Sequence, residues 1–130
     1  MHWSEKYWRS LYLVGNSLIL TSTTISLKEP FRDGSETYIR WARSIKLSSN
    51  KFSRHIPSEL FNCSSLLVMS LDDNLLDSTL PSEMGGLRSI NRLNLSHNRL
   101  SNAISPSIGK LRNLYELDLS QNFFSGNIPF

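Results

Sequence analysis

Cysteine is nearly absent from this sequence of 130 residues, since Cys63 is its single occurrence. No disulfide can form within the chain, so it lacks the usual cross-link of a small secreted domain. Long apolar runs are missing as well. The longest, residues 11–20, is too short and too interrupted to cross a bilayer or to work well as a signal peptide. We therefore expect neither a membrane span nor a targeting segment in these residues.

An excess of charge of one sign is also missing. The 14 lysines and arginines against 11 acidic residues give a net charge of +3. Neither half of the chain has a basic block dense enough to indicate nucleic acid or an anionic membrane as a partner. The composition is otherwise that of an ordinary globular protein.

What the sequence does contain is a regular internal repeat. Four asparagines, Asn50, Asn74, Asn98 and Asn122, follow one another at a constant interval, which is the repeat period. Large apolar residues stand three and five positions before each asparagine, and others two and six positions after it. Such a period is the signature of a stacked repeat. The unit reads L-x-L-x-x-N-x-L/F-x-x-x-I/L, which is a leucine-rich repeat.

The first half of each repeat predicts a short strand over x-L-x-L-x, with both apolar side chains directed inward. Neighbouring strands should stack in parallel about 4.8 Å apart, because no repeat can bury its own apolar row. The asparagine amide both donates and accepts hydrogen bonds. A column of asparagines can therefore satisfy the backbone groups at the point where each strand turns away.

The second half of each repeat carries three more apolar columns, which we expect to pack on the convex side in short 3-10 or irregular turns. The columns are Leu60, Met84 and Ile108; Cys63, Leu87 and Leu111; and Leu66, Ile90 and Leu114. Cys63 takes a place that leucine fills in the other repeats. A buried small hydrophobe is therefore favoured there over a reactive thiol.

Residues 1–43 do not follow the period. Residues 11–18 match L-x-L-x-x-N-x-L, but Asn16 lies further before Asn50 than one period allows. They are either a degenerate repeat followed by an insertion or a strand-like stretch that matches by chance. Residues 21–27 predict a strand, because β-branched side chains are frequent there, and residues 29–34 predict a turn.

Three aromatic residues near the start, Trp3, Tyr7 and Trp8, allow two interpretations. They either cover the open end of the first repeat as a cap or form an interaction surface. We favour the cap.

The last repeat resembles a particular type. Residues 114–129 read LYELDLSQNFFSGNIP, which resembles the plant repeat L-x-x-L-x-L-S-x-N-x-L-x-G-x-I-P. Residues 93–100 and 45–52 are similar. This is the repeat of plant leucine-rich-repeat receptor kinases, receptor-like proteins and polygalacturonase inhibitors, and the resemblance covers residues 44–130. Residues 23–50 more weakly resemble the segment that follows the non-repeat island of receptor-like proteins, where a strand ending in lysine precedes the membrane-proximal repeats.

The resemblance implies an α/β leucine-rich-repeat solenoid with a parallel sheet on the concave face. It implies three full repeats and one partial repeat in residues 44–130, after an island-like segment in residues 1–43. As function it implies non-enzymatic binding of a protein or peptide ligand and a co-receptor ectodomain at the extracellular face of the plasma membrane, in immune or developmental signalling. No cofactor is implied. A membrane contact would come only through segments that this chain lacks.

Two other interpretations remain open, a secreted polygalacturonase-inhibitor-like protein and a nonfunctional truncated product. The island-like segment argues against the first. Departures from the family pattern indicate a fragment or a truncated gene product, because the cysteine-bearing caps are missing and the chain stops within a repeat, and they keep the second interpretation open. The family glycine stands only at Gly126, with Arg54, Ser78 and Asn102 at the matching places. If the position needs positive φ, arginine costs most.

The candidate binding residues flank the inward leucines and should face the concave surface, which solenoids use to bind extended partners. They are Lys46, Ser70, Asp72, Asp73, Arg92, Asn94, His97, Glu116, Asp118 and Gln121, with Ser96 among their neighbours. Catalysis is not predicted, because no base, nucleophile and orienting group converge. Adjacent aspartates on a strand point to opposite faces, so a shared metal site at Asp72 and Asp73 is not expected.

Two glycosylation sequons occur, at Asn62 and Asn94. Sugar on Asn94 would lie on the concave sheet and block nearby contacts. Sugar on Asn62 would lie on the convex side and do no harm there.

Overall fold

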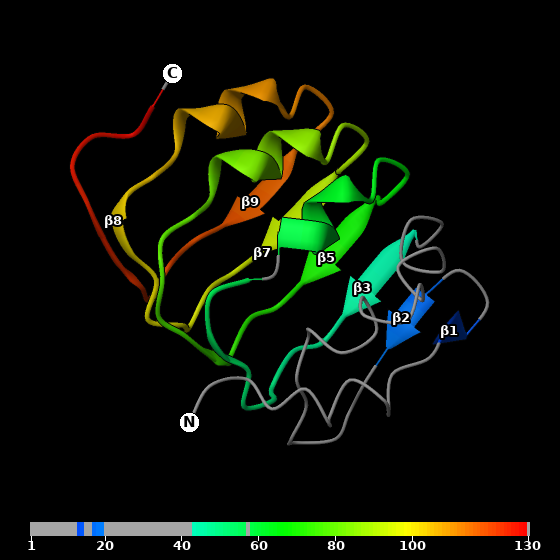
Figure 1. The fold of residues 1–130 in the computed structure, drawn as a ribbon, viewed down its shortest axis with the longest axis horizontal. Helices are drawn as coiled ribbons and strands as arrows, with labels where there is room; N and C mark the ends of the chain where they lie inside the picture. The colour runs from blue at the N-terminus through cyan, green and yellow to red at the C-terminus, as the bar shows by residue number, and fades with distance from the viewer. Residues whose placement is uncertain (1–12, 15–16, 20–42, 57, 130) are drawn as a thin grey trace.

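The computed structural model describes residues 13–14, 17–19, 43–56 and 58–129. In this part of the chain, successive repeats stack side by side, with a sheet on one side and short 3-10 helices on the other (Figure 1). The main sheet has the strand order β1-β2-β3-β5-β7-β9. Its strands are β1 (Leu13–Val14), β2 (Ser17–Ile19), β3 (Ser44–Lys46), β5 (Val68–Ser70), β7 (Arg92–Asn94) and β9 (Glu116–Asp118). The predicted leucine-rich-repeat solenoid with a parallel sheet is confirmed.

The second half of each repeat forms a 3-10 helix, as expected from the convex columns. The helices are η3 (Ser58–Asn62), η4 (Ser82–Gly86) and η5 (Pro106–Lys110). Short strands between sheet and helices form two further parallel pairs, β4 (Ser53–Arg54) with β6 (Leu75–Leu76) and β8 (Ser101–Ala103) with β10 (Phe123–Ser125). These pairs were not predicted.

From β3 to β9, the register of the main sheet equals the repeat period. Ile45 lies beside Met69, Met69 beside Leu93 and Leu93 beside Leu117. Inward residues of the first three of these strands are fully buried, and the convex columns pack against them in one continuous core. Cys63 is part of this core, as predicted.

The strands β3, β5, β7 and β9 are three residues long, not the five expected. The backbone ladder still continues past β3, because the Leu47 amide donates to the Ser70 carbonyl at 2.8 Å. The Leu47 carbonyl, however, accepts from the side-chain amides of Asn50 and Asn74 at 2.9 and 3.1 Å. The asparagine column thus takes the carbonyl that a longer strand would use for pairing.

The asparagine column makes the hydrogen bonds that the amide chemistry predicts. Asn74 Nδ2 donates to the carbonyls of Leu47, Leu71 and Asp72, and its Oδ1 accepts from the backbone amides of Asn50 and Phe52. Asn98 and Asn122 donate to the equivalent carbonyls, two in their own repeat and one in the preceding repeat. Each side chain therefore links two neighbouring repeats at their turn.

Positive φ occurs at two places in the repeat. At the family glycine position, φ is 66° at Arg54, 64° at Asn102 and 78° at Gly126, whereas Ser78 is not among the residues with positive φ. The position directly before each asparagine also has positive φ. These residues are Ser49, Asp73, His97 and Gln121, with φ between 53° and 56°. This second column was not predicted.

The start of the sheet has a register of its own. Strand β2 pairs in parallel with β3 and places Leu18 beside Ile45, and β1 pairs with β2 in antiparallel fashion. A degenerate repeat around Asn16 would align Leu11 with Ile45, but both residues 11 and 16 lie outside the described residues, so the two interpretations of residues 11–18 stay predictions. The strand expected over 21–27, the turn over 29–34 and the aromatic cap lie outside the described residues. No helix in the described ranges has the length and apolarity to span a membrane.

Candidate recognition surface

The register of β3, β5, β7 and β9 aligns their outward side chains in two rows across the sheet. One row contains Lys46, Ser70, Asn94 and Asp118, and the other contains Ser44, Val68, Arg92 and Glu116. Lys46, Arg92, Glu116 and Asp118 are exposed, while Ser70 and Asn94 are half-buried. The predicted strand residues therefore lie on one surface, which we call the concave rows.

Asp72 and Asp73 lie just beyond the end of β5 and each contacts a serine of the preceding repeat. The Ser48 hydroxyl donates to Asp72 Oδ1 at 2.6 Å, and the Ser49 hydroxyl donates to Asp73 Oδ2 at 2.9 Å. The chain has already turned at Asp73, where φ is 56°. The two carboxylates thus extend the surface past the strand ends. Within the described ranges, no group of three or more His, Cys, Asp or Glu side chains is placed to hold a metal ion.

Asn94 and Asp118 occupy the same place in successive repeats and make the same turn. The side-chain oxygen of Asn94 accepts from the backbone amide and hydroxyl of Ser96 at 3.0 and 2.7 Å. Asp118 accepts from the corresponding groups of Ser120 at 3.0 and 2.6 Å. These Ser120 hydrogen bonds, with a smaller contribution from the charge of His97, hold the pKa of the Asp118 carboxyl below its usual value.

This turn corrects the expectation for Ser96. The alternation of the strand had placed Ser96 on the exposed surface, but it is only 4% exposed. The strict alternation ends with the strand at Asn94, and the Ser96 hydroxyl folds back onto the Asn94 side chain. Ser96 is therefore unavailable to a partner.

A cluster around Arg92 connects the neighbouring strands β7 and β9. Arg92 Nε lies 3.0 Å from Glu116 Oε2 and donates to the Tyr115 hydroxyl at 3.1 Å. Its guanidinium lies 5.7 Å from the centre of the Tyr115 ring. The Tyr115 hydrogen bond, followed by the charges of Tyr115 and Glu116, raises the pKa of Arg92. Because Arg92 and Glu116 are exposed, the ion pair adds little stability and remains open to a partner.

Tyr115 was missed by the sequence analysis. It stands directly before β9 and is 69% exposed. The same position holds Arg43, Leu67 and Asn91 in the other repeats. A single aromatic residue in a column that is otherwise without one, beside a charged row, was the pattern that could have indicated it.

The remaining predicted residues lie at the margins. His97 and Gln121 are exposed in the positive-φ column, next to the concave rows. Asn62 is exposed at the end of η3, away from the sheet. Asn94 lies within the concave rows, and its side-chain oxygen is already engaged by Ser96.

Two family descriptions match this chain. One, "Leucine rich repeat", matches residues 42–100, and a second of the same kind matches residues 113–130, which together cover more than half of the sequence. No curated protein matches the chain.

Several solved structures of plant receptors are similar. The ectodomain of the Arabidopsis thaliana receptor kinase GASSHO1/SCHENGEN3, in complex with CASPARIAN STRIP INTEGRITY FACTOR 2, is 35% identical with a TM-score of 0.68, over 83% of this chain and 15% of that one. The plant peptide hormone receptor RGFR1 in complex with RGF2 is 30% identical with a TM-score of 0.73, over 87% and 18%.

A third similar structure is the Arabidopsis HAESA ectodomain in complex with an N-terminally extended IDA peptide. It is 30% identical with a TM-score of 0.74, over 88% of this chain and 19% of that one. The chain thus spans less than a fifth of each of these three receptors. It belongs to the leucine-rich-repeat family, and its repeats are of the kind found in plant receptor ectodomains.

Proposed function

We propose that the chain is a non-enzymatic recognition module that binds an extended peptide across the concave rows. The observation that carries this proposal is the register of the main sheet. It places exposed polar side chains of changing character side by side, above an apolar core that hardly changes from repeat to repeat. A solenoid surface of this kind suits an extended partner.

The similar structures support a peptide and a second receptor as partners. HAESA was solved with an IDA peptide hormone, the peptide hormone receptor RGFR1 with RGF2, and GASSHO1/SCHENGEN3 with CASPARIAN STRIP INTEGRITY FACTOR 2. HAESA was also solved with the co-receptor SERK1, and BIR3 with SERK2. We extend this to a role for the chain in a receptor ectodomain outside the plasma membrane, in immune or developmental signalling.

The chemistry of the surface suggests how binding works. The backbone of the inner strands is already paired within the sheet, so a peptide must be held by side chains. Arg92 and Tyr115 combine charge with rigid aromatic area, the residue types that dominate binding energy at interfaces. Asp72, Asp73 and Asp118 supply acceptors for peptide amides or basic side chains. Lys46, Ser70, His97, Glu116 and Gln121 complete the polar surface around them.

Glycosylation has different consequences at the two sequons. We propose that Asn62 can carry a sugar without effect on binding, because it is exposed at the end of η3 on the convex side. A sugar at Asn94 would stand between Ser70 and Asp118 in the same row and exclude a peptide.

Calorimetric titration of the 130-residue chain with the three ligands named above and a library of extended peptides tests the proposal. We expect saturable binding of at least one peptide. The variants Arg92→Ala and Asp118→Ala should each lower its affinity about tenfold, which corresponds to about 1.4 kcal/mol.

The matched control is Arg112→Ala, which removes an exposed arginine outside the concave rows and should leave peptide affinity unchanged. Retained affinity in both concave variants would exclude the concave rows as the peptide site. Absence of binding by every peptide would contradict the peptide-recognition function itself.

A further inference from the structure

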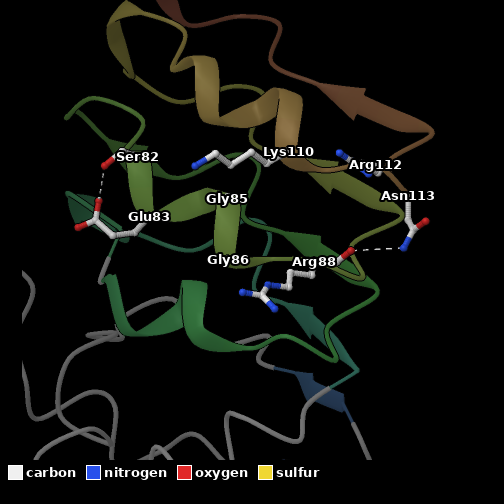
Figure 2. A pocket seen from close by; sticks show the side chains of 8 residues that line it. All are labelled: Ser82, Glu83, Gly85, Gly86, Arg88, Lys110, Arg112 and Asn113. Atoms are coloured by element: carbon white, nitrogen blue, oxygen red, sulfur yellow. Dashed lines mark hydrogen bonds between the residues drawn. The ribbon is translucent and has the colours of Figure 1, made fainter.

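A groove lies between η4 and η5, on the helical side of the repeats. Its volume is about 600 Å³ and its lining is drawn in Figure 2. The lining residues are Ser82, Glu83, Gly85, Gly86, Arg88, Lys110, Arg112 and Asn113. None of them belongs to the predicted binding residues or to a strand of the main sheet.

At this groove, η4 has no side chain at a position where η3 has a bulky one. The position that Phe61 fills in the preceding repeat is Gly85 here, one period later. A Cβ on Gly85 would lie 3.0 Å from Lys110 Cδ, so the absence of a side chain lets the Lys110 stem lie across η4. On its other side η4 packs closely on η3, since a Cβ on Gly86 would lie 2.4 Å from the Phe61 carbonyl oxygen. The open space is therefore confined to the side of η5.

Three positive charges line this space without a partner in the described residues. The charged groups of Arg88, Lys110 and Arg112 make no ion pair or hydrogen bond within the described ranges, and all three side chains are exposed. In Figure 2, Lys110 and Arg88 lie on the two sides of the glycine pair. The single acidic lining residue, Glu83, accepts a hydrogen bond from the Ser82 hydroxyl at 3.1 Å. The lining carries a net charge of +2 (three basic and one acidic residue), which favours an anionic ligand.

The other lining groups narrow the class of anion. The Ser82 hydroxyl donates to Glu83 at 3.1 Å and Asn113 Nδ2 donates to the Arg88 carbonyl at 3.3 Å, so the side-chain oxygens of Ser82 and Asn113 are the atoms that can accept hydrogen bonds from ligand hydroxyl groups. The groove has no strand edge along which a peptide backbone could pair and no aromatic residue in its lining, which are the features that peptide recognition commonly uses. A ligand with repeated carboxylates and hydroxyls on a compact ring matches this lining, and the volume is within the usual range of ligand sites.

We propose that this groove binds a linear acidic oligosaccharide, with sugar carboxylates held by Arg88, Lys110 and Arg112. Arginine pairs with a carboxylate through two parallel hydrogen bonds, and lysine contributes a point charge. The site is separate from the concave rows, so it goes beyond the peptide-recognition function and does not depend on it.

Titration of the 130-residue chain with an oligogalacturonate in low-salt buffer tests the proposal. We expect saturable binding that weakens strongly as sodium chloride is added, because exposed charges are screened beyond about 10 Å at 0.1 M salt. The double variant Lys110→Gln, Arg112→Gln should bind at least tenfold more weakly, and so should Arg88→Gln with Lys110→Gln. All three side chains are exposed, so the variants should keep the fold, which circular dichroism checks.

The matched control is Arg92→Gln, which removes one positive charge from the concave rows and should leave the oligogalacturonate affinity unchanged. A neutral oligosaccharide of glucose should not bind, and polyglutamate should bind at least tenfold more weakly than the oligogalacturonate. The proposal is overturned if the oligogalacturonate does not bind, if polyglutamate binds equally well, if the groove variants keep full affinity, or if Arg92→Gln lowers it as much as they do. Because Arg92 serves the peptide site and Lys110 this groove, failure of either site can be distinguished from failure of the other.

Discussion

The buried asparagines connect neighbouring repeats through side-chain hydrogen bonds at the turns. Asn74 makes three donor bonds to carbonyls of two repeats while only 5% exposed. The expectation that an amide is needed at this place rested on its ability to donate and accept at once. The observed bonds confirm it, because Nδ2 and Oδ1 are both in use.

Replacement of Asn74 by aspartate should therefore destabilise the chain. The change Asn74→Asp removes the three donor bonds and buries a charge beside carbonyl oxygens. We expect the free energy of unfolding to fall by about 3 kcal/mol. Urea unfolding followed by circular dichroism measures this as a lower midpoint at an unchanged m value.

The control is Asn122→Asp in the last of the four asparagines. Asn122 makes the equivalent bonds but is half-buried, so water can replace part of what is lost. Its variant should lose clearly less stability. Equal losses at both positions would show that burial does not set the effect.

The family glycine position provides a second prediction, with opposite signs in two repeats. Arg54 adopts φ of 66°, which is costly for a residue with a Cβ, whereas Ser78 at the matching place does not have positive φ. Arg54→Gly should raise the free energy of unfolding by about 0.5 to 1 kcal/mol, and Ser78→Gly should lower it by a similar amount. Thermal unfolding of both variants checks the signs. A gain for Ser78→Gly would contradict the assignment.

Among single residues, prediction succeeded where one chemical type repeats and failed where types differ. The asparagine column and the strain at Arg54 could be anticipated because asparagine and glycine have distinct chemistry. The column of Ser49, Asp73, His97 and Gln121 shares positive φ but no common side chain, so no pattern pointed to it. The burial of Ser96 depends on a turn that strand alternation does not describe.

The repeats themselves differ in how closely their 3-10 helices approach. Helix η4 meets η3 at Gly86, where a Cβ would lie 2.4 Å from the Phe61 carbonyl oxygen, which belongs to the backbone. At Gly85 a Cβ would meet the flexible Lys110 side chain at 3.0 Å. Two adjacent glycines therefore serve different purposes.

Alanine substitutions at these two glycines should distinguish the backbone contact at Gly86 from the side-chain contact at Gly85. Gly86→Ala must push η3 and η4 apart and should cost about 1 to 3 kcal/mol, as overpacking of a close contact does. Gly85→Ala requires only that Lys110 move, so its effect should stay within about 1 kcal/mol. Urea unfolding of both variants measures the difference. Similar losses in the two would contradict the geometric distinction.

The parallel sheet and the convex 3-10 turns could be predicted because their apolar columns recur at a fixed period. The pairs β4–β6 and β8–β10 could not, since their strands are two or three residues long and lack the alternation that marks a strand. The groove between η4 and η5 also escaped prediction. The groove depends on how residues of neighbouring repeats are placed next to one another, and this is known only once the repeats have stacked.

The apolar residues of the solenoid are not equally shielded from solvent in all repeats. Leu117 and Ile128 in the last repeat are 42% and 75% exposed, while Leu93 in the repeat before is 1% exposed. In stacked repeats, stability depends mainly on contacts with direct neighbours. The last repeat should therefore open before the middle ones.

Amide hydrogen exchange followed by NMR tests this order. The amides of Leu47 and Leu71, which bond to carbonyls of the second and third repeats, should exchange slowly. Those of Glu116 and Phe123 should exchange at least tenfold faster, because local opening of an end exposes them without unfolding the rest. Uniform protection across all four amides would instead indicate a single cooperative transition.

The coincidence of register and sequence period has a consequence for how such chains vary in evolution. Each strand from β3 to β7 pairs with its equivalent in the next repeat. A recombination event that deletes or duplicates one whole period therefore rejoins every strand, asparagine and convex turn to an equivalent partner. The backbone hydrogen bonds and the core are kept, whereas the order of exposed side chains across the sheet changes in a single event. An insertion that is not a whole number of periods breaks the ladder at the junction.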